Sequence, residues 1–382
     1  MRADCLEPAN SRIIDYGGRL PLGLRLDEGR AVKRVLLAMF LAVGLWFVAP
    51  AALPAQLSSN SVAQEVRALT GARTRIVWVQ HTGDGTDIFA HGANLRLLGL
   101  DSDDGHGERE LVPGEGSFCR PMITPGGDHV VFTNFTSQGV YIVNWDGSGL
   151  QELVRGIAAG VWRDPDTGQE WVYAQVGSEV GVNARNNPIW RFRIDATEVR
   201  ELVWNKTPVN PDGFQISRDG KQVVSLFPWP HFGVATLPND TVSELGQGCC
   251  ASMAADIGNM AFHLLGDHRH LMVYSLKGTE DRWKVAVNTA PGVDGFEIYH
   301  PKWSNQSRYM AMCGPFRGKG GITAEIYLGR FDPTLHSIEG WVRVTTNDKG
   351  DFYPDVWVDP VQLKVLRFSL NGSPVLEPAG AN

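Results

Sequence analysis

The chain has 382 residues, with 43 glycines, 22 prolines and a hydrophobic fraction of 43%. This composition excludes a largely disordered protein and suits many short strands joined by tight turns. The formal net charge is −7. Because binding to nucleic acid depends on clustered Lys and Arg that displace counterions, and no such cluster is present, a nucleic-acid partner is excluded as well.

The first patterned segment is a predicted signal peptide. Lys33 and Arg34 precede an apolar run over residues 35–50, and small residues lead to Ala55, before Gln56. This order of basic, apolar and small residues is typical of secretory signals, and the run is shorter than the ~20 residues that span a bilayer. We therefore predict cleavage after Ala55, a periplasmic or secreted protein, and no stable membrane anchor after cleavage.

The segments around the signal peptide carry little pattern of their own. We interpret residues 1–32 as an unstructured or over-long N-terminus, 33–55 as the signal peptide and 56–72 as a linker. Of the 35 Lys and Arg and the 42 Asp and Glu residues, seven basic and five acidic ones lie in residues 1–55, so the remainder carries a net charge of −9. A chain this acidic repels phosphate backbones.

A repeat dominates the rest of the chain. A short strand, a polar or glycine-containing turn and a strongly apolar strand recur five times, with the copies beginning at Cys119, Gly160, Asp212, Cys249 and Tyr299. A third and a fourth apolar strand follow each copy. The spacing of roughly 40–50 residues matches one four-stranded blade of a β-propeller.

The two ends of the repeat region complement each other. The segment 352–358 matches a first strand without its partners, whereas Thr74, Leu95 and Arg109 begin three strands that lack a first one. Joining them makes a sixth blade and removes open edges that would invite aggregation. We predict an all-β, six-bladed β-propeller over residues 73–360, closed by pairing a C-terminal strand with N-terminal strands, and a C-terminal extension over 361–382.

Two repeats carry a family resemblance. The segments 300–311 (HPKWSNQSRYMA) and 213–224 (GFQISRDGKQVV) resemble the P-x-W-S-P-D-G-K-x-I-A-F repeat of TolB-type propellers. The resemblance implies an exported six-bladed propeller. It leaves the function open, because such propellers serve scaffolding, hydrolysis and polysaccharide cleavage alike.

Chemically rich side chains gather on one predicted edge of the propeller, which we term the rim. The rim consists of the loops between second and third strands (176–188, 228–232, 266–270 and 314–322) and the loops that lead into first strands (246–250 and 290–300). The turns between first and second strands, on the opposite face, are short and plain. Loops on a rigid scaffold usually carry function, so we predict that the rim is the functional face.

A metal site is one interpretation of the rim. Cys249, Cys250, His268, His270 and His300 belong to consecutive blades, and imidazole with thiolate favours zinc or copper among divalent metals. The alternative, that these are ordinary loop histidines bonded to neighbouring carbonyls, stays open. So does the state of the adjacent cysteines, which are either two thiols or a vicinal disulfide.

Three further side-chain groups have structural interpretations. His263 aligns with apolar positions in the middle of second strands, which predicts a packed core histidine, and Cys313 is predicted to be a small buried hydrophobe. Trp162, Trp303 and Trp357 recur near one position of first strands. That recurrence predicts packing between blades.

Two functions fit these observations. The favoured one is a binding module for an extracytoplasmic protein or glycan, with the contact residues Trp229, His231, Arg317, Tyr353 and Asp355. The other follows from similarity to secreted lyases for acidic polysaccharides, which are propellers too. It implies an enzyme for uronate-containing polysaccharide in which His268, His300 or Tyr299 acts as base and Arg269 or Arg317 holds the carboxylate.

Overall fold

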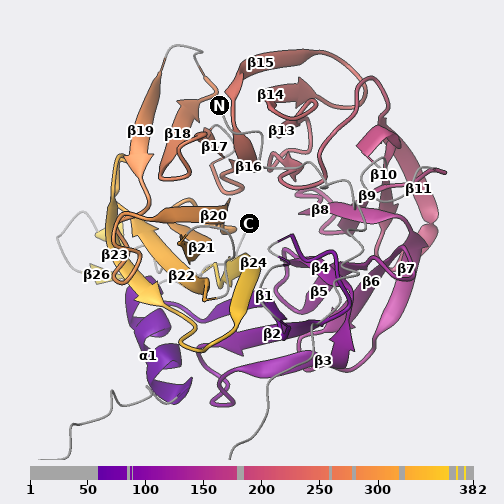
Figure 1. The fold of residues 1–382 in the computed structure, drawn as a ribbon. Helices are drawn as coiled ribbons and strands as arrows, with labels where there is room; N and C mark the ends of the chain where they lie inside the picture. Colours follow the sequence, from indigo (N-terminus) through magenta and orange to yellow (C-terminus); the bar gives the residue numbers. More distant parts are fainter. Residues whose placement is uncertain are drawn as a thin grey trace, which may run out of the picture. The chain divides into compact units, whose positions relative to one another are not determined.

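Six four-stranded antiparallel sheets are arranged in a ring in the computed structural model (Figure 1). The structure describes residues 59–83, 87, 89–178, 185–257, 260–277, 281–317, 323–360, 367–368 and 374–375. The predicted six-bladed β-propeller is therefore confirmed. The predicted signal peptide and the segment before it lie outside the described residues.

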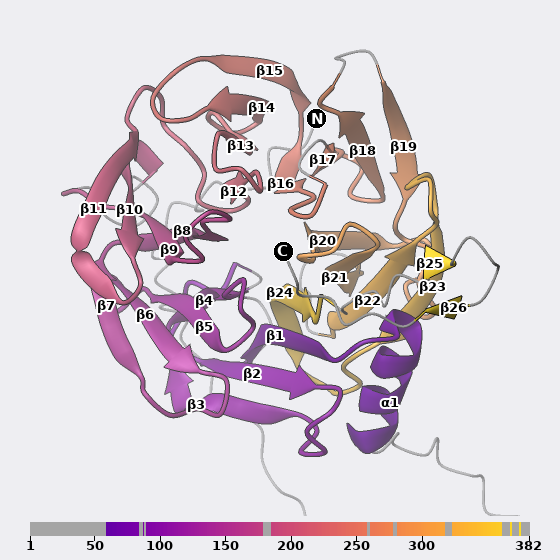
Figure 2. The same cartoon turned by 180° about the vertical axis from the view of Figure 1, so that it is seen from behind.

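Each blade contributes one strand to each of four concentric positions, as both face views show (Figures 1 and 2). The innermost strands are β24 (Gly350–Val358), β4 (Phe118–Ile123), β8 (Ile157–Arg163), β12 (Gln215–Ile216), β16 (Cys249–Met253) and β20 (Glu297–Trp303). The second strands are β1 (Thr74–His81), β5 (His129–Asn134), β9 (Glu170–Gln175), β13 (Gln222–Leu226), β17 (Met260–Leu264) and β21 (Tyr309–Phe316).

The outer half of each blade is more exposed to solvent. The third strands are β2 (Leu95–Asp101), β6 (Gly139–Asn144), β10 (Ile189–Arg193), β14 (His231–Thr236), β18 (His270–Ser275) and β22 (Glu325–Phe331). The fourth strands are β3 (Arg109–Gly116), β7 (Gln151–Arg155), β11 (Ala196–Trp204), β15 (Val242–Gln247), β19 (Arg282–Ala286) and β23 (Ile338–Arg343). A separate pair, β25 (Arg367–Phe368) and β26 (Pro374–Val375), follows the ring.

The two ends of the propeller meet in one blade. Strand β24 pairs antiparallel with β1, in a register that runs from Thr74 opposite Val358 to His81 opposite Gly350. All nine residues of β24 are buried. This pairing is the closure that the strand count predicts, and it leaves β1 without an open edge because β1 now lies between β24 and β2.

The segment expected to be a linker contains a helix, α1 (Ser59–Thr70). Val62 and Val66 lie one turn apart and are both buried, as expected for a helix with one apolar face. The helix ends at Thr70 and is followed by Gly71, whose φ of +71° suits glycine and whose N–H donates to the carbonyl of Arg67. Helix α1 packs beside β22, β23 and β1 (Figure 1), so it belongs to the folded body.

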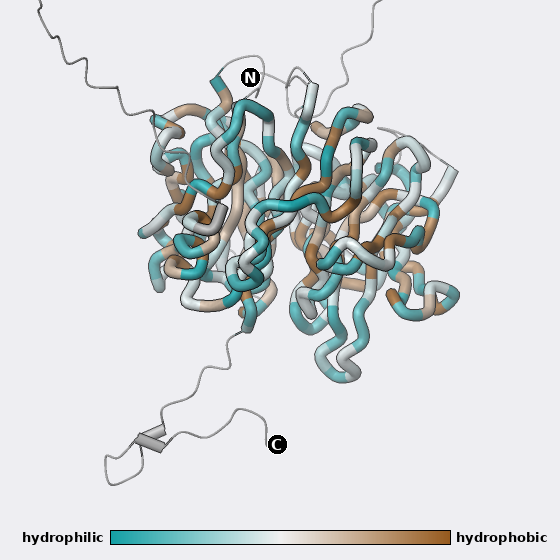
Figure 3. The backbone as a smooth tube through the Cα atoms, turned by 90° about the horizontal axis from the view of Figure 1, so that it is seen from below, coloured by the Kyte–Doolittle hydropathy of each residue, from teal (hydrophilic) through white to brown (hydrophobic). Residues whose placement is uncertain are grey.

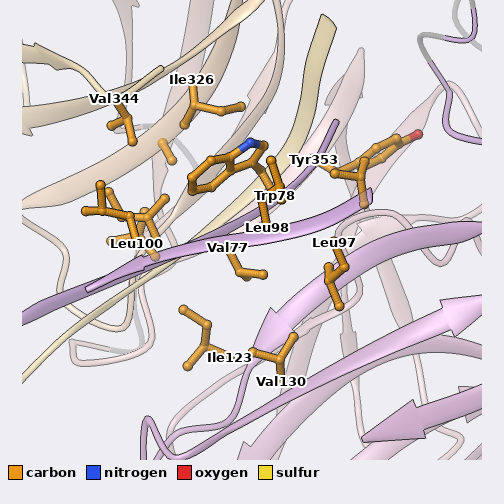
Figure 4. Close-up of a cluster of buried hydrophobic side chains, with 14 of the residues drawn as sticks. Val77, Trp78, Leu97, Leu98, Leu100, Ile123, Val130, Ile326, Val344 and Tyr353 are labelled. Carbon is orange, nitrogen blue, oxygen red and sulfur yellow. The ribbon is translucent and has the colours of Figure 1, made fainter. Parts of the chain in front are cut away.

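Apolar side chains fill the space between neighbouring blades. In the closing blade, Val77, Trp78 and Leu98 pack against apolar residues of the blades on both sides (Figure 4). Hydrophobic and hydrophilic segments alternate along the chain, and several of the loops that protrude from the body are hydrophilic (Figure 3). The indole N–H groups of Trp162 and Trp357 each donate to a backbone carbonyl of the next blade's turn, which confirms their predicted role in packing between blades.

Two further expectations concern single residues and the membrane. His263 is 1% exposed and contacts the rings of Phe232 and Tyr274, and Cys313 is fully buried, so both are core residues as predicted. Burial lowers the pKa of His263 to about 4. Among the described residues, no helix is long and apolar enough to cross a membrane.

Candidate functional site

A cavity of about 530 Å³ lies on the propeller axis. The innermost strands of all six blades contribute to its lining, and they surround the centre of the ring (Figure 1). Much of the wall is apolar, formed by Met122, Ile123, Phe214, Ile216, Met253 and Val356. The cavity falls within the ~300–1,000 Å³ range that is common for ligand pockets.

Four of the six innermost strands carry the same β-bulge at the cavity. In β4, Cys119 pairs with Thr133 and Met122 with Val131, so two residues lie opposite one. Strands β16, β20 and β24 repeat this shift. The first residue of each bulge has a positive φ of 50–54°; these residues are Arg120, Cys250, His300 and Tyr353.

The backbone is strained at these four residues, and the strain indicates that the cavity is a functional site. A left-handed conformation costs a residue with a Cβ roughly 1–2 kcal/mol, and bulges near functional sites redirect side chains. All four residues line the cavity. Strained residues at equivalent positions around one cavity identify it as the candidate functional site.

The rings of His300 and Tyr353 stack in the cavity wall, with centroids 3.8 Å apart. Burial lowers the pKa of His300 to about 3, with further contributions from the charges of Arg120 and His268. Burial also raises the pKa of the Tyr353 hydroxyl and of the Cys313 thiol. At neutral pH all three side chains are therefore uncharged. The Nδ1 atom of His300 lies 3.3 Å from the sulfur of Cys313.

The charged side chains that line the cavity beside these rings form ion pairs between blades. Arg120 pairs with Asp212 two blades further on, with Nη2 lying 3.1 Å from Oδ2. Lys302 pairs with Asp355 of the adjacent blade at 2.8 Å. The second oxygen of Asp355 accepts a hydrogen bond from the N–H of Ile123. The polar groups of the cavity wall are thus largely satisfied within the protein.

Several of the predicted rim residues do not line this cavity. The ring of His268 contacts that of Tyr299 in a tilted arrangement, with ring centroids 4.4 Å apart, and its Nδ1 lies 3.6 Å from Glu297. His270 contacts Asp267 at 2.7 Å, and His231 contacts Glu244 at 2.9 Å. These three rim histidines therefore pair with carboxylates, whereas the alternative considered above was pairing with carbonyls.

The remaining rim residues have separate surroundings. Trp229 is half-buried and packs against the apolar cluster between the blade of β12–β15 and the blade of β16–β19. The guanidinium of Arg317 lies over the ring of Phe296 and donates to the carbonyl of Gly292. Arg269 is exposed on its loop.

The predicted metal ligands are only partly brought together. The sulfurs of Cys249 and Cys250 lie 3.6 Å apart, and His268 is near enough to His300 to influence its pKa. His270 contacts Asp267 on its own loop. In the part of the chain that the structure describes, no three His, Cys, Asp or Glu side chains are placed to hold a metal ion. The metal site stays a prediction without a supporting cluster.

The cavity extends toward the face opposite the rim, where the sequence predicted only short turns between first and second strands. Turn residues between first and second strands contribute to its lining, among them Pro125, Pro165, Arg218, Asp256 and Gln306. None of the described residues in the second-to-third rim loops lines it. Of the predicted site residues, Cys250, His300, Tyr353 and Asp355 do.

Sequence reasoning missed Arg120, Asp212 and Lys302. A usable signal was present for the first of them. Proline follows the left-handed residue in three bulges, as Pro121, Pro301 and Pro354, and a bulge is one of the few places where a strand tolerates a residue without an N–H. The shared position of Arg120, His300 and Tyr353 could have been found from this pattern.

No family model and no curated protein matches the sequence. Solved structures do match. TolB from Acinetobacter baumannii aligns over 76% of this chain and 69% of its own, with 13% identity and a TM-score of 0.52. A chain of the nidogen/laminin complex aligns over 74% of this chain and 98% of its own, with 9% identity and a TM-score of 0.51.

A third match is weaker. An oligogalacturonate lyase in complex with manganese aligns over 74% of this chain and 83% of its own, with 10% identity and a TM-score of 0.41, too low to support an argument about activity. Identities at this level show the fold alone. Residues 74–358 form a six-bladed β-propeller with the fold of the TolB propeller.

Proposed function

We propose that this chain is a binding module that takes an apolar segment of an extracytoplasmic protein into its central cavity. The observation that carries the proposal is the cavity of about 530 Å³, with apolar walls and polar groups already paired within the protein. Such a wall favours a ligand that gains free energy by burying apolar surface. The location outside the cytoplasm depends on the predicted signal peptide.

The ionisation of the wall supports binding over catalysis. General acid–base catalysis works best when the pKa of the group lies near the working pH. The pKa of His300 is lowered to about 3 and that of Tyr353 is raised. Near neutral pH the His300 imidazole therefore does not take up a proton, and the Tyr353 hydroxyl does not release one. Arg120 and Lys302 are each engaged by a carboxylate. Neither His300 nor Tyr353 is therefore suited to general acid–base catalysis near neutral pH.

A protein ligand fits the wall better than a glycan does. Sugar recognition uses open aromatic faces and unpaired polar groups. The three tryptophans of the wall are 2–8% exposed, since their rings pack within and between blades. Bulky apolar side chains of a peptide need neither feature.

The lyase remains a second candidate because of one contact. His268 and Tyr299 lie side by side on the rim, with Glu297 close to His268, and these are two of the residue types that a lyase uses as its base. A uronate-polymer assay that follows unsaturated products by ultraviolet absorbance tests this candidate directly. Turnover that His268→Ala abolishes would favour the enzyme.

The binding proposal is tested by filling the cavity. Ala255 is half-buried in a turn that lines the cavity, so Ala255→Trp places an indole in the ligand's space at little cost to the fold. Peptides selected from a phage-displayed library on the purified protein are measured by calorimetry. We expect Ala255→Trp to weaken their binding by about tenfold or more, equivalent to ~1.4 kcal/mol.

The matched control is Glu198→Trp, which adds the same indole to an exposed position of the outer strand β11. It should bind the selected peptides like the unmodified protein. Equal binding by the Ala255→Trp variant, with its melting temperature unchanged, would refute the central cavity as the ligand site.

A further inference from the structure

We propose that Cys249 and Cys250 form a reversible vicinal disulfide in the wall of the central cavity. The site is a modification site in addition to the binding role proposed above, and it depends on the geometry of β16 rather than on any ligand. Both residues are thiols in the structure.

The bulge in β16 brings the two sulfurs together. In a regular strand successive side chains point to opposite faces, which would separate adjacent cysteines. Cys250 instead has a φ of 54° at the first position of the bulge, and its sulfur lies 3.6 Å from that of Cys249. A disulfide bond of about 2.05 Å then requires only a short approach of the two sulfurs.

The two cysteines differ in their exposure to solvent. Cys249 is 6% exposed, whereas Cys250 is half-buried and lines the cavity. The other two cysteines of the propeller, Cys119 and Cys313, are fully buried. An oxidant that enters the cavity therefore meets Cys250 first.

The buried cysteines are poor competitors for the oxidant. The thiolate is the reactive form of cysteine, and burial raises the pKa of Cys119 to about 11 and that of Cys313 well above its ordinary value. Both remain thiols at neutral pH.

The reaction is a two-step exchange with a disulfide-bearing oxidant such as oxidised glutathione. The Cys250 thiolate attacks one sulfur of the oxidant, which forms a mixed disulfide and releases one thiol. The Cys249 thiolate then attacks the Cys250 sulfur and releases the second thiol. Two protons and two electrons leave the protein, and one oxidant disulfide is reduced to two thiols.

The product should be easy to reduce. Adjacent Cα atoms lie about 3.8 Å apart, closer than the ~4.4 Å at which ordinary disulfides begin. The ring formed by neighbouring cysteines is therefore strained, and strained disulfides are the labile ones. This lability makes the modification reversible.

The experiment uses the folded full chain and oxidised glutathione. After exposure, remaining thiols are blocked with N-ethylmaleimide and the peptide that contains both cysteines is analysed by mass spectrometry. We expect that peptide to lose two hydrogen masses, to carry no maleimide, and to regain both thiols on treatment with reduced glutathione.

Variants identify the partners. Cys249→Ser should stop at the first step and keep a glutathione adduct on Cys250, whereas Cys119→Ser and Cys313→Ser should still form the disulfide. A stable glutathione adduct on Cys250 of the unmodified protein would overturn the proposal. So would a cross-link from Cys250 to Cys313, or a pair that reacts only after the protein is unfolded.

Discussion

Asp351 shows how burial sets the charge of a single residue in the closing blade. It is fully buried in β24, where its Oδ1 atom accepts hydrogen bonds from the indole of Trp78 and the amide of Gln80. Burial, with the nearby charge of Glu325, raises the pKa of its carboxyl group to about 8. The side chain is therefore largely protonated at neutral pH, unlike an ordinary aspartate.

This raised pKa predicts how stability depends on pH. Between the ordinary aspartate pKa and about 8, the folded state binds the Asp351 proton and the unfolded state does not. The stabilisation by Asp351 is therefore complete below the ordinary pKa and is lost as pH rises through 8. The loss is at most ~1.4 kcal/mol per pH unit for one proton.

Replacing Asp351 with Asn removes this titration while keeping the size of the side chain. We expect the free energy of unfolding of Asp351→Asn, measured by urea denaturation, to fall less steeply than that of the unmodified protein between pH 6 and 9. Asp240→Asn, which removes a surface carboxylate, is the control and should leave the slope unchanged. Parallel pH profiles for all three proteins would contradict the prediction.

At the scale of elements, α1 is held to the propeller by few but specific contacts. The Tyr309 hydroxyl donates to the carbonyl of Thr70, and Arg330 donates to the carbonyl of Leu69. Val66 is fully buried in the apolar cluster of the closing blade. The helix thus covers the junction of the first and last blades, where the chain closes on itself.

Val66→Ala tests whether α1 contributes to stability. Removing a buried branched side chain costs both its burial and the cavity left behind, so we expect the free energy of unfolding to fall by about 2 kcal/mol. Glu65→Ala alters an exposed neighbour on the same helix and should change stability by less than about 0.5 kcal/mol. If both variants unfold like the unmodified protein, α1 is dispensable to the fold.

At the scale of the whole molecule, the ring depends on one pairing between distant segments. Strand β24 is the innermost strand of a blade whose other three strands lie at the start of the propeller. Without β24, strand β1 and the inner strands of the two flanking blades lose a buried neighbour. Unpaired strand edges and exposed apolar surface favour aggregation.

Two truncations separate closure from general damage to the C-terminus. A chain that stops after Asp348 lacks all of β24 and should aggregate or lose cooperative thermal unfolding. A chain that stops after Pro360 keeps β24 and should unfold cooperatively at a temperature close to that of the full chain. A soluble, cooperative protein ending at Asp348 would show that the ring closes without β24.

The strand pattern could be predicted from the sequence because its causes are local. Alternating apolar residues, polar turns and their regular spacing indicated four strands per blade, and the unmatched segments at 74–116 and 352–358 indicated closure. His263 and Trp357 were also recognised as packed residues, because their repeat positions carry apolar residues elsewhere. Helix α1 was missed, since a helix of 12 residues carries only a short apolar pattern and depends on packing against the propeller for its stability.

Sequence by itself determined the number of blades and the way the ring closes, because both follow from contacts between neighbouring strands. Only the tertiary structure decided where the site lies, since residues separated by many repeats meet at the axis. Arg120 and Asp212 pair across two blades, and a bulge turns Cys250 toward Cys249. Such contacts depend on backbone φ angles and on the curvature of the ring, which no local pattern of residues encodes.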